Sequence, residues 1–168
     1  EEILRKYERY EGKVNWHMIG SLQSNKIKYV TGTACMIHSV DSQRLAAEID
    51  KQAAKRGVVM DVLVEINSGE EESKSGVSPK EAEELCIAIK QYGHLNLRGF
   101  MTMAPKCEKK EDYLKYFQQT YAQVLDIWTK KLHNIGRPII SMGMSDSYRI
   151  AIEEGSTLVR IGRRFFEK

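Results

Sequence analysis

Short β-rich runs alternate with segments of helical periodicity along the whole chain, and this alternation constrains the fold more than any other feature. Such alternation is typical of parallel βαβ construction and not of a β-sandwich or a helix bundle. The sequence therefore predicts an α/β fold. The six segments that we expect to form strands are 14–20, 35–40, 58–67, 97–103, 138–142 and 157–161.

Helical spacing and helix-start signals fill the intervals between these strands. Asp41 or Ser42 can cap a helix that ends at Gly57, and Ser78-Pro79-Lys80-Glu81 combines a cap, a first-turn proline and a capping-box glutamate. The expected helices are an opening one containing Tyr7 and Tyr10, then 22–30, 43–57, 79–92, a long one from about 110, and 146–154. The long helix carries a stripe that we assign to the core: Tyr113, Phe117, Tyr121, Val124 and Trp128.

The number of strand-helix units leaves two architectures open. Six units in 168 residues come to about 28 residues each, close to the roughly 30 of a (β/α)8 barrel. The sheet is either an open, doubly wound one or a barrel without its first two strands, and composition does not decide between them. No linker, repeat or low-complexity tract divides the chain, so we expect one domain over 1–168.

Composition narrows the functional classes. The chain is 42% hydrophobic and 29% charged, and its net charge of +3 lacks the excess typical of a nucleic-acid binder. No apolar run reaches the roughly 20 residues of a membrane span, and no signal peptide is evident, so we expect a cytoplasmic protein that contacts neither membrane nor nucleic acid. Cys35, Cys86 and Cys107 are scattered, as are the four histidines, so we expect reduced thiols and no metal site.

Residues at the carboxyl ends of the last two strands suggest a phosphate site. The segment 141–145 leads into a helix near Asp146, whose first turn presents unpaired backbone N–H groups. Gly162 permits close backbone approach, and Arg160 adds a permanent cation. The alternative remains open that Ser145 only caps a helix, Gly162 only turns the chain and Arg160 only pairs with an acid.

Two isolated side chains within apolar strands are weaker candidates. His17 lies in the first strand, where a hydrogen-bonded core histidine is the commoner arrangement and a catalytic base the rarer one. Glu65 interrupts a run of aliphatic residues and is either an interior ion-pair partner or an outward-facing charge. Neither residue alone indicates a reaction.

Six stretches in order along the chain resemble the pyridoxal phosphate homeostasis proteins, whose barrel is similar to the N-terminal domain of bacterial alanine racemase. They are WHMIGSLQSNK (16–26), IHSVDS (37–42), EESKSG (71–76), MTMAP (101–105), SMGMS (141–145) and VRIG (159–162). The resemblance covers nearly the whole chain. It implies a TIM barrel that holds pyridoxal 5'-phosphate (PLP) at its carboxyl-end mouth.

The resemblance also implies roles for individual residues. Ser145 and Ser141 would hold the phosphate, together with the backbone at Gly162 and Arg163. Arg160 would face the pyridine nitrogen and keep it unprotonated, which suits a carrier better than an enzyme that stabilises carbanions. Three further residues fall in the matching stretches and complete the expected cofactor-binding set: Met142, Ser21 and His17.

The chain departs from the family at two places. The family's Schiff-base lysine ends its first barrel strand and a partner asparagine follows the second, and neither strand is among these six. No lysine here is expected at a strand's carboxyl end facing the mouth, since Lys26, Lys28 and Lys74 fall on helix or loop positions. The resemblance therefore assigns the covalent lysine to no residue. The tail 163–167 also differs from the small residues common in the family.

The leading interpretation is a PLP-binding protein of PLP homeostasis that performs no turnover and serves PLP-dependent apo-enzymes. The alternative is a PLP-dependent, racemase-like enzyme with His17 or His38 as proton carrier. A third possibility is a structural module with a vestigial phosphate site. Family members are expected to be monomers, whereas a barrel segment with two open edges is expected to aggregate or dimerise.

Overall fold

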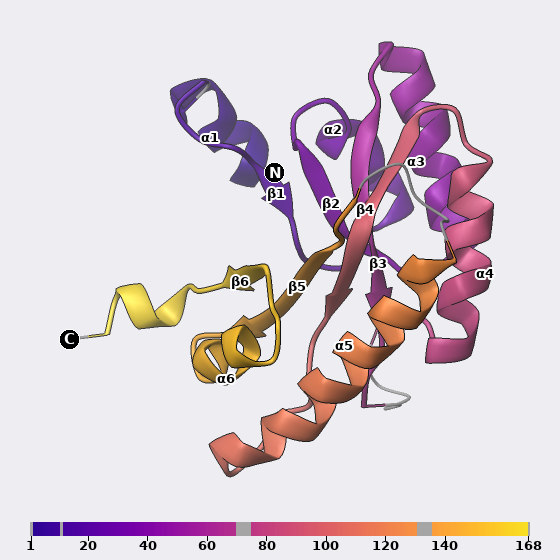
Figure 1. Cartoon of the computed structure of the whole chain (residues 1–168). Helices are drawn as coiled ribbons and strands as arrows, with labels where there is room; N and C mark the ends of the chain where they lie inside the picture. The colour runs from indigo at the N-terminus through magenta and orange to yellow at the C-terminus, as the bar shows by residue number, and fades with distance from the viewer. Residues whose placement is uncertain (1, 11, 70–74, 131–135, 168) are drawn as a thin grey trace.

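A single six-stranded parallel sheet organises the molecule in the computed structural model, which describes residues 2–10, 12–69, 75–130 and 136–167 (Figure 1). The strand order along the sheet is β1-β2-β3-β4-β5-β6. The predicted α/β fold is confirmed. The strands are β1 (His17–Met18), β2 (Met36–Val40), β3 (Met60–Ile66), β4 (Leu95–Thr102), β5 (Ile139–Met144) and β6 (Leu158–Arg160).

The strand order decides between the two architectures. Every strand pairs in parallel with the strand that follows it in the chain, so the sheet winds in one direction only. A doubly wound sheet would reverse its order at a switch point, whereas sequential addition curls a sheet toward a barrel. The sheet is therefore part of a barrel of the TIM type.

The helices follow the strands and cover the sheet. Figure 1 shows α3, α4 and α5 along one side of the sheet, with α6 near the end of β5. The helices are α1 (Glu2–Tyr10), α2 (Ile27–Val30), α3 (Gln43–Arg56), α4 (Pro79–Lys90), α5 (Tyr113–Thr129) and α6 (Tyr148–Glu153). Short 3-10 helices span Ser24–Lys26, Lys110–Asp112 and Arg163–Phe165. None of the helices in the described segments is long and apolar enough to cross a membrane.

The helix boundaries arise from the capping residues that the sequence indicated. The Ser42 hydroxyl accepts a hydrogen bond from the Leu45 N–H, and Gly57 ends α3 in the left-handed conformation. Ser78 and Glu81 form both hydrogen bonds of a capping box at the start of α4. These predictions are confirmed. The two serine caps satisfy N–H groups that the helix starts leave unpaired, and the Gly57 N–H donates to carbonyl groups at the end of α3.

The beginning of the chain differs from the expectation. The strand predicted over 14–20 shortens to the two residues of β1, and the helix predicted over 22–30 divides into a 3-10 turn and α2. The β1 strand lies at the edge of the sheet and pairs only with β2, so it lacks a second ladder that would extend it. The 3-10 turn over Arg163–Phe165 was not predicted.

The core lies between the helices and the sheet. Of the predicted aromatic stripe on α5, Tyr113, Phe117, Val124 and Trp128 are buried as expected. Tyr121 is 36% exposed, which differs from the expectation. The described sheet ends at β1 and β6, and Phe166 beyond β6 is 88% exposed. Dimerisation of this chain stays a prediction.

Candidate functional site

A cavity of about 480 Å³ opens where β4, β5 and β6 end. Its volume lies within the roughly 300–1,000 Å³ of pockets that bind small molecules and cofactors. The carboxyl ends of parallel strands are where such folds place ligands. The lining residues are Thr102, Met103, Ala104, Lys106, Tyr113, Phe117, Gly143, Met144, Ser145, Asp146, Ser147, Arg160, Gly162 and Arg163.

Two neighbouring loops form the polar wall of this cavity. The register of β5 and β6 pairs Met144 with Arg160, so the loops that follow begin side by side. The backbone N–H of Arg164 donates to the Ser145 hydroxyl at 3.3 Å and joins the two loops. Gly143 allows α6 to pack close to the strand end, because its φ is +91° and a Cβ there would lie 2.5 Å from the Ala151 methyl.

Arg160 spans two strands beneath the cavity. One guanidinium nitrogen, Nη1, donates to the Ser141 carbonyl and to the Ser141 hydroxyl, each at 2.7 Å, and Nη2 donates to the Thr102 carbonyl at 2.8 Å. These bonds use three of the five N–H groups of a guanidinium and leave two for a ligand. Burial lowers the pKa of Arg160 to about 10, opposed by Glu65, so the side chain remains a cation at neutral pH.

Glu65 is an interior carboxylate, since it is 2% exposed. Burial raises its pKa, while a hydrogen bond from Ser75 and the charge of Arg160 act in the opposite direction. The outward-facing alternative is therefore wrong. The negative charge of Glu65 on β3 stabilises the buried guanidinium of Arg160 on β6.

A chain of hydrogen bonds links Arg160 to the first strand. His38 Nδ1 lies 3.1 Å from the Ser141 hydroxyl, and His38 Nε2 lies 2.9 Å from His17 Nδ1. Arg160 can only donate, so the Ser141 hydroxyl accepts from Arg160 and donates its own hydrogen to His38 Nδ1. The hydrogen of His38 is then on Nε2, which donates to His17 Nδ1. In this arrangement His38 is neutral and engaged at both nitrogens.

The buried position of His38 makes stability depend on pH. Burial, together with the positive charges of His17 and Arg160, lowers the pKa of His38 from 6.5 to about 4. Between these values the unfolded chain binds a proton that the folded chain does not, so stability is full above pH 6.5 and falls toward pH 4. We expect the free energy of unfolding, measured by urea denaturation, to fall by about 3 kcal/mol over this range.

Two variants identify His38 as the source of this pH dependence. His38→Gln should flatten the slope, even if its stability at pH 7 is lower. His94→Gln changes a histidine that is outside this chain of contacts and 3.6 Å from Asp50, and it should keep the slope. An equally steep slope in His38→Gln would contradict the assignment.

The structure brings four of the predicted site residues together at the cavity: Ser145, Arg160, Gly162 and Arg163. Ser141 is fully buried and lies behind the wall, where its hydroxyl contacts Arg160 and His38. The other predicted residues lie farther away. Met142 is a core residue, His17 is half-buried in β1 and contacts His38, and Ser21 is exposed in the loop after β1.

One expectation about lysines is wrong. Lys106 follows β4 by four residues and lines the cavity, although no lysine was expected at the mouth. Lys106 lies beyond the residues that directly end the strand, with Pro105 in between. Lys26 and Lys28 do fall on helices, and Lys74 lies outside the described residues. Thr102 is a further lining residue, and so are Tyr113 and Phe117, which the sequence assigned to the core stripe.

The residues at the cavity fit the groups of PLP. Its phosphate requires hydrogen-bond donors and cations, and its pyridine nitrogen accepts a hydrogen bond from Arg160 if the nitrogen is unprotonated. A Cβ placed on Gly162 would meet no atom within 4 Å, so the cavity has open space directly beside the backbone there. Tyr113 and Phe117 add aromatic side chains to the lining of the cavity.

Most of the chain matches a known protein family. Residues 10–166 match the alanine racemase N-terminal domain. The pyridoxal phosphate homeostasis protein of Aquifex aeolicus is 42% identical over 167 residues, covering 99% of this chain and 72% of the relative. Its counterpart in Schizosaccharomyces pombe is 33% identical and is covered over 70% of its length.

Solved structures show the same relationship. PipY of Synechococcus elongatus PCC7942 with PLP bound superposes with a TM-score of 0.87 at 26% identity, covering 99% of this chain and 77% of PipY. A Bifidobacterium adolescentis protein of unknown function gives a TM-score of 0.81 at 35% identity, and this chain spans 61% of its length. Alanine racemase of Clostridium difficile shares the fold at 18% identity, with a TM-score of 0.76.

Proposed function

Because this chain belongs to the pyridoxal phosphate homeostasis proteins of the alanine racemase N-terminal domain family, we propose that it binds PLP and takes part in PLP homeostasis. The observation that carries the proposal is the cavity in which Arg160, Ser145 and Gly162 meet from two adjacent strand ends. PLP bound in PipY supports the same ligand for this chain. We propose that residues 1–168 form one PLP-binding domain.

Each part of the cavity has a role in the proposal. The Ser145 hydroxyl and the backbone at Gly162 and Arg163 hold the phosphate, and the two remaining N–H groups of Arg160 face the pyridine nitrogen. When bound, PLP supplies an aldehyde and an electron-withdrawing ring. Ser141 and Thr102 fix the guanidinium of Arg160, so that it is oriented before the ligand arrives.

We propose storage and delivery of PLP to apo-enzymes and no turnover. The enzymatic alternative needs His17 or His38 at the cavity as its proton carrier. His38 is fully buried and hydrogen-bonded at both nitrogens, and His17 lies beyond it, so neither histidine lines the cavity. Three free cysteines support a role in the reducing cytoplasm.

Ser145→Ala tests the proposed site. A hydrogen bond to a charged group contributes about 1.5–3 kcal/mol, so the loss of the hydroxyl should weaken PLP binding about 10- to 100-fold. Binding is measured by calorimetry with the full chain. The smaller pyridoxal, which has no phosphate, should bind the variant and the unaltered chain equally.

A matched control separates this effect from a general one. Ser24→Ala removes an exposed hydroxyl from the first 3-10 turn, which is not part of the cavity, and should leave PLP affinity unchanged. Failure of the unaltered chain to bind PLP would refute the proposal. Racemisation of L-alanine in the presence of PLP would instead favour the enzymatic alternative.

A further inference from the structure

The cavity contains three cationic side chains, and they differ in how their charges are compensated. Arg163 donates to both carboxylate oxygens of Asp146, at 2.6 and 2.7 Å, and lies 2.9 Å from Glu167. Arg160 is fixed by Ser141 and Thr102. Lys106 has no hydrogen bond or ion pair with any residue in the described part of the chain. Its ammonium is therefore available to a ligand.

The backbone holds Lys106 at the rim while leaving its side chain free. Pro105 is buried, and its ring restricts φ, so the chain leaves β4 in a defined direction. The exposed side chain of Lys106 follows directly and carries its charge on a flexible four-carbon stem. Because β4 pairs with β5 and β5 with β6, the loop of Lys106 adjoins the loops of Ser145 and Gly162.

Charge balance indicates what Lys106 does. A phosphate monoester carries about −1.5 to −2 charges at neutral pH. The charged lining residues are three cations and one carboxylate, Asp146, so they present two net positive charges. In the proposed function Arg160 faces the pyridine nitrogen, and Arg163 is paired with Asp146 and Glu167. Lys106 is therefore the lining cation whose charge is left for the phosphate.

We propose that Lys106 pairs with the phosphate of bound PLP through an ionic contact and thereby selects phosphorylated over unphosphorylated B6 compounds. The contact forms without a covalent bond to the PLP aldehyde. The inference rests on the proposed function, since it assigns a further residue to the same cavity. Lys106, in the loop after β4, would join Ser145 and Gly162 from the loops after β5 and β6 as a partner of the phosphate.

Binding of PLP and of pyridoxal to Lys106→Gln and Lys106→Arg tests this role by calorimetry. We expect PLP affinity to fall about 10-fold or more in Lys106→Gln, which is the effect of about 1.4 kcal/mol. Pyridoxal affinity should not change, and Lys106→Arg should retain most of the PLP affinity. Lys109→Gln removes an exposed charge from the same loop but outside the cavity, and should leave PLP affinity within about twofold of the unaltered chain.

The possible results separate this inference from the proposed function. Equal PLP affinity in Lys106→Gln and the unaltered chain would overturn the inference and leave the proposed function intact. A parallel loss of PLP and pyridoxal binding would overturn a phosphate-specific role. A stoichiometric lysine adduct at Lys106 after borohydride reduction and peptide mass spectrometry would show covalent attachment and overturn the ionic one. No PLP binding by the unaltered chain would refute both.

Discussion

Gly99→Ala should lower the free energy of unfolding by about 3 kcal/mol or more. The urea unfolding curve of this variant should then begin at a much lower urea concentration, with a short native baseline or none. Gly99 lies in β4 with a φ of +149°, which strains any residue with a side chain. An added Cβ would collide with the carbonyl oxygen of Ile139 and lie 2.6 Å from its nitrogen. Both atoms belong to the backbone of β5, so relief requires the two strands to separate.

The measurement is urea denaturation followed by circular dichroism, with Gly93→Ala as the matched control. A Cβ on Gly93 would meet no atom within 4 Å, so this variant should unfold within about 1 kcal/mol of the unaltered chain. Because Arg160 bridges β4 and β5 through Thr102 and Ser141, separated strands should also lose PLP. An unaltered midpoint in Gly99→Ala would contradict the close approach of these strands.

The sequence predicted the fold class from alternation, because buried parallel strands and amphipathic helices leave distinct periodicities. It also located the caps at Ser42 and Ser78, since capping depends on nearby residues alone. Strand order was not accessible from periodicity, because pairing joins residues distant in the chain. For this reason the choice of barrel came from the resemblance, and the sequential ladder from β1 to β6 then confirmed it.

The site was predictable to the extent that it lies at strand ends. Ser145, Arg160 and Gly162 were predictable because each lies at or just beyond the end of a β-rich run, whereas the role of Arg163 came from the resemblance. Ser141 shares the same segment, but it lies within β5, where its hydroxyl is fully buried against Arg160 and His38, and a motif does not reveal this burial. Lys106 was missed because the direction of the chain beyond Pro105 depends on tertiary packing. A lysine within four residues of a strand end is the signal that could have found it.

His38 illustrates how burial changes the meaning of a residue type. In the sequence it is a candidate proton carrier, because an ordinary histidine titrates near neutral pH. In the structure it is fully buried between His17 and Ser141, and its pKa is about 4. It therefore acts as a neutral link that orients Ser141 and, through Ser141, the guanidinium of Arg160.

Arg160→Ala should have the largest effect on binding, with a loss of PLP affinity of about 100-fold or more. It removes the cation that faces the ligand ring in the proposed function. It also leaves the Thr102 and Ser141 carbonyls without their donor. A buried unpaired acceptor costs about 1–3 kcal/mol, so the loss of a donor to both carbonyls should lower the free energy of unfolding by about 2–6 kcal/mol as well. Calorimetry at 10 °C and circular dichroism together measure both effects on folded protein.

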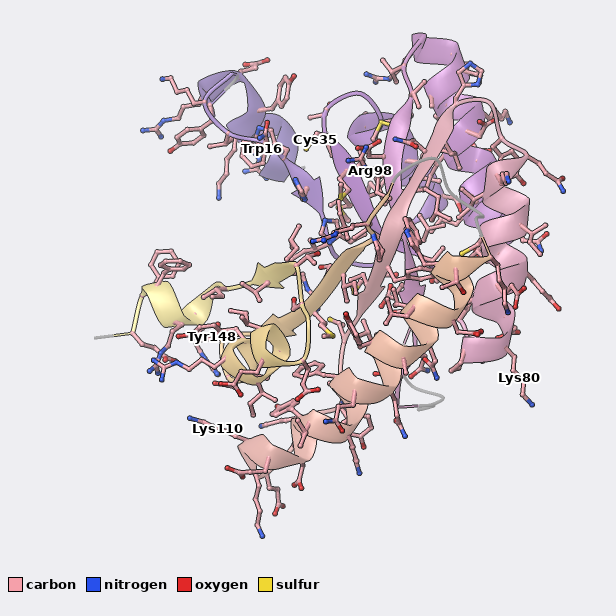
Figure 2. All side chains as sticks on the ribbon, in the orientation of Figure 1. Trp16, Cys35, Lys80, Arg98, Lys110 and Tyr148 are labelled. Carbon is pink, nitrogen blue, oxygen red and sulfur yellow. The ribbon has the colours of Figure 1, made fainter. Side chains whose placement is uncertain are left out.

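Arg160→Lys and Arg98→Ala separate geometry from charge. Lysine keeps the positive charge but lacks the planar fork that reaches both β4 and β5, so it should recover only a small part of the affinity. Arg98 lies on β4 far from α6, as Figure 2 shows, and its contact with Asp61 is 3.6 Å long. Arg98→Ala should therefore keep full PLP affinity. If Arg160→Lys bound PLP as tightly as the unaltered chain, the charge alone would suffice, and the bridge from Arg160 to Thr102 and Ser141 would have no part in binding.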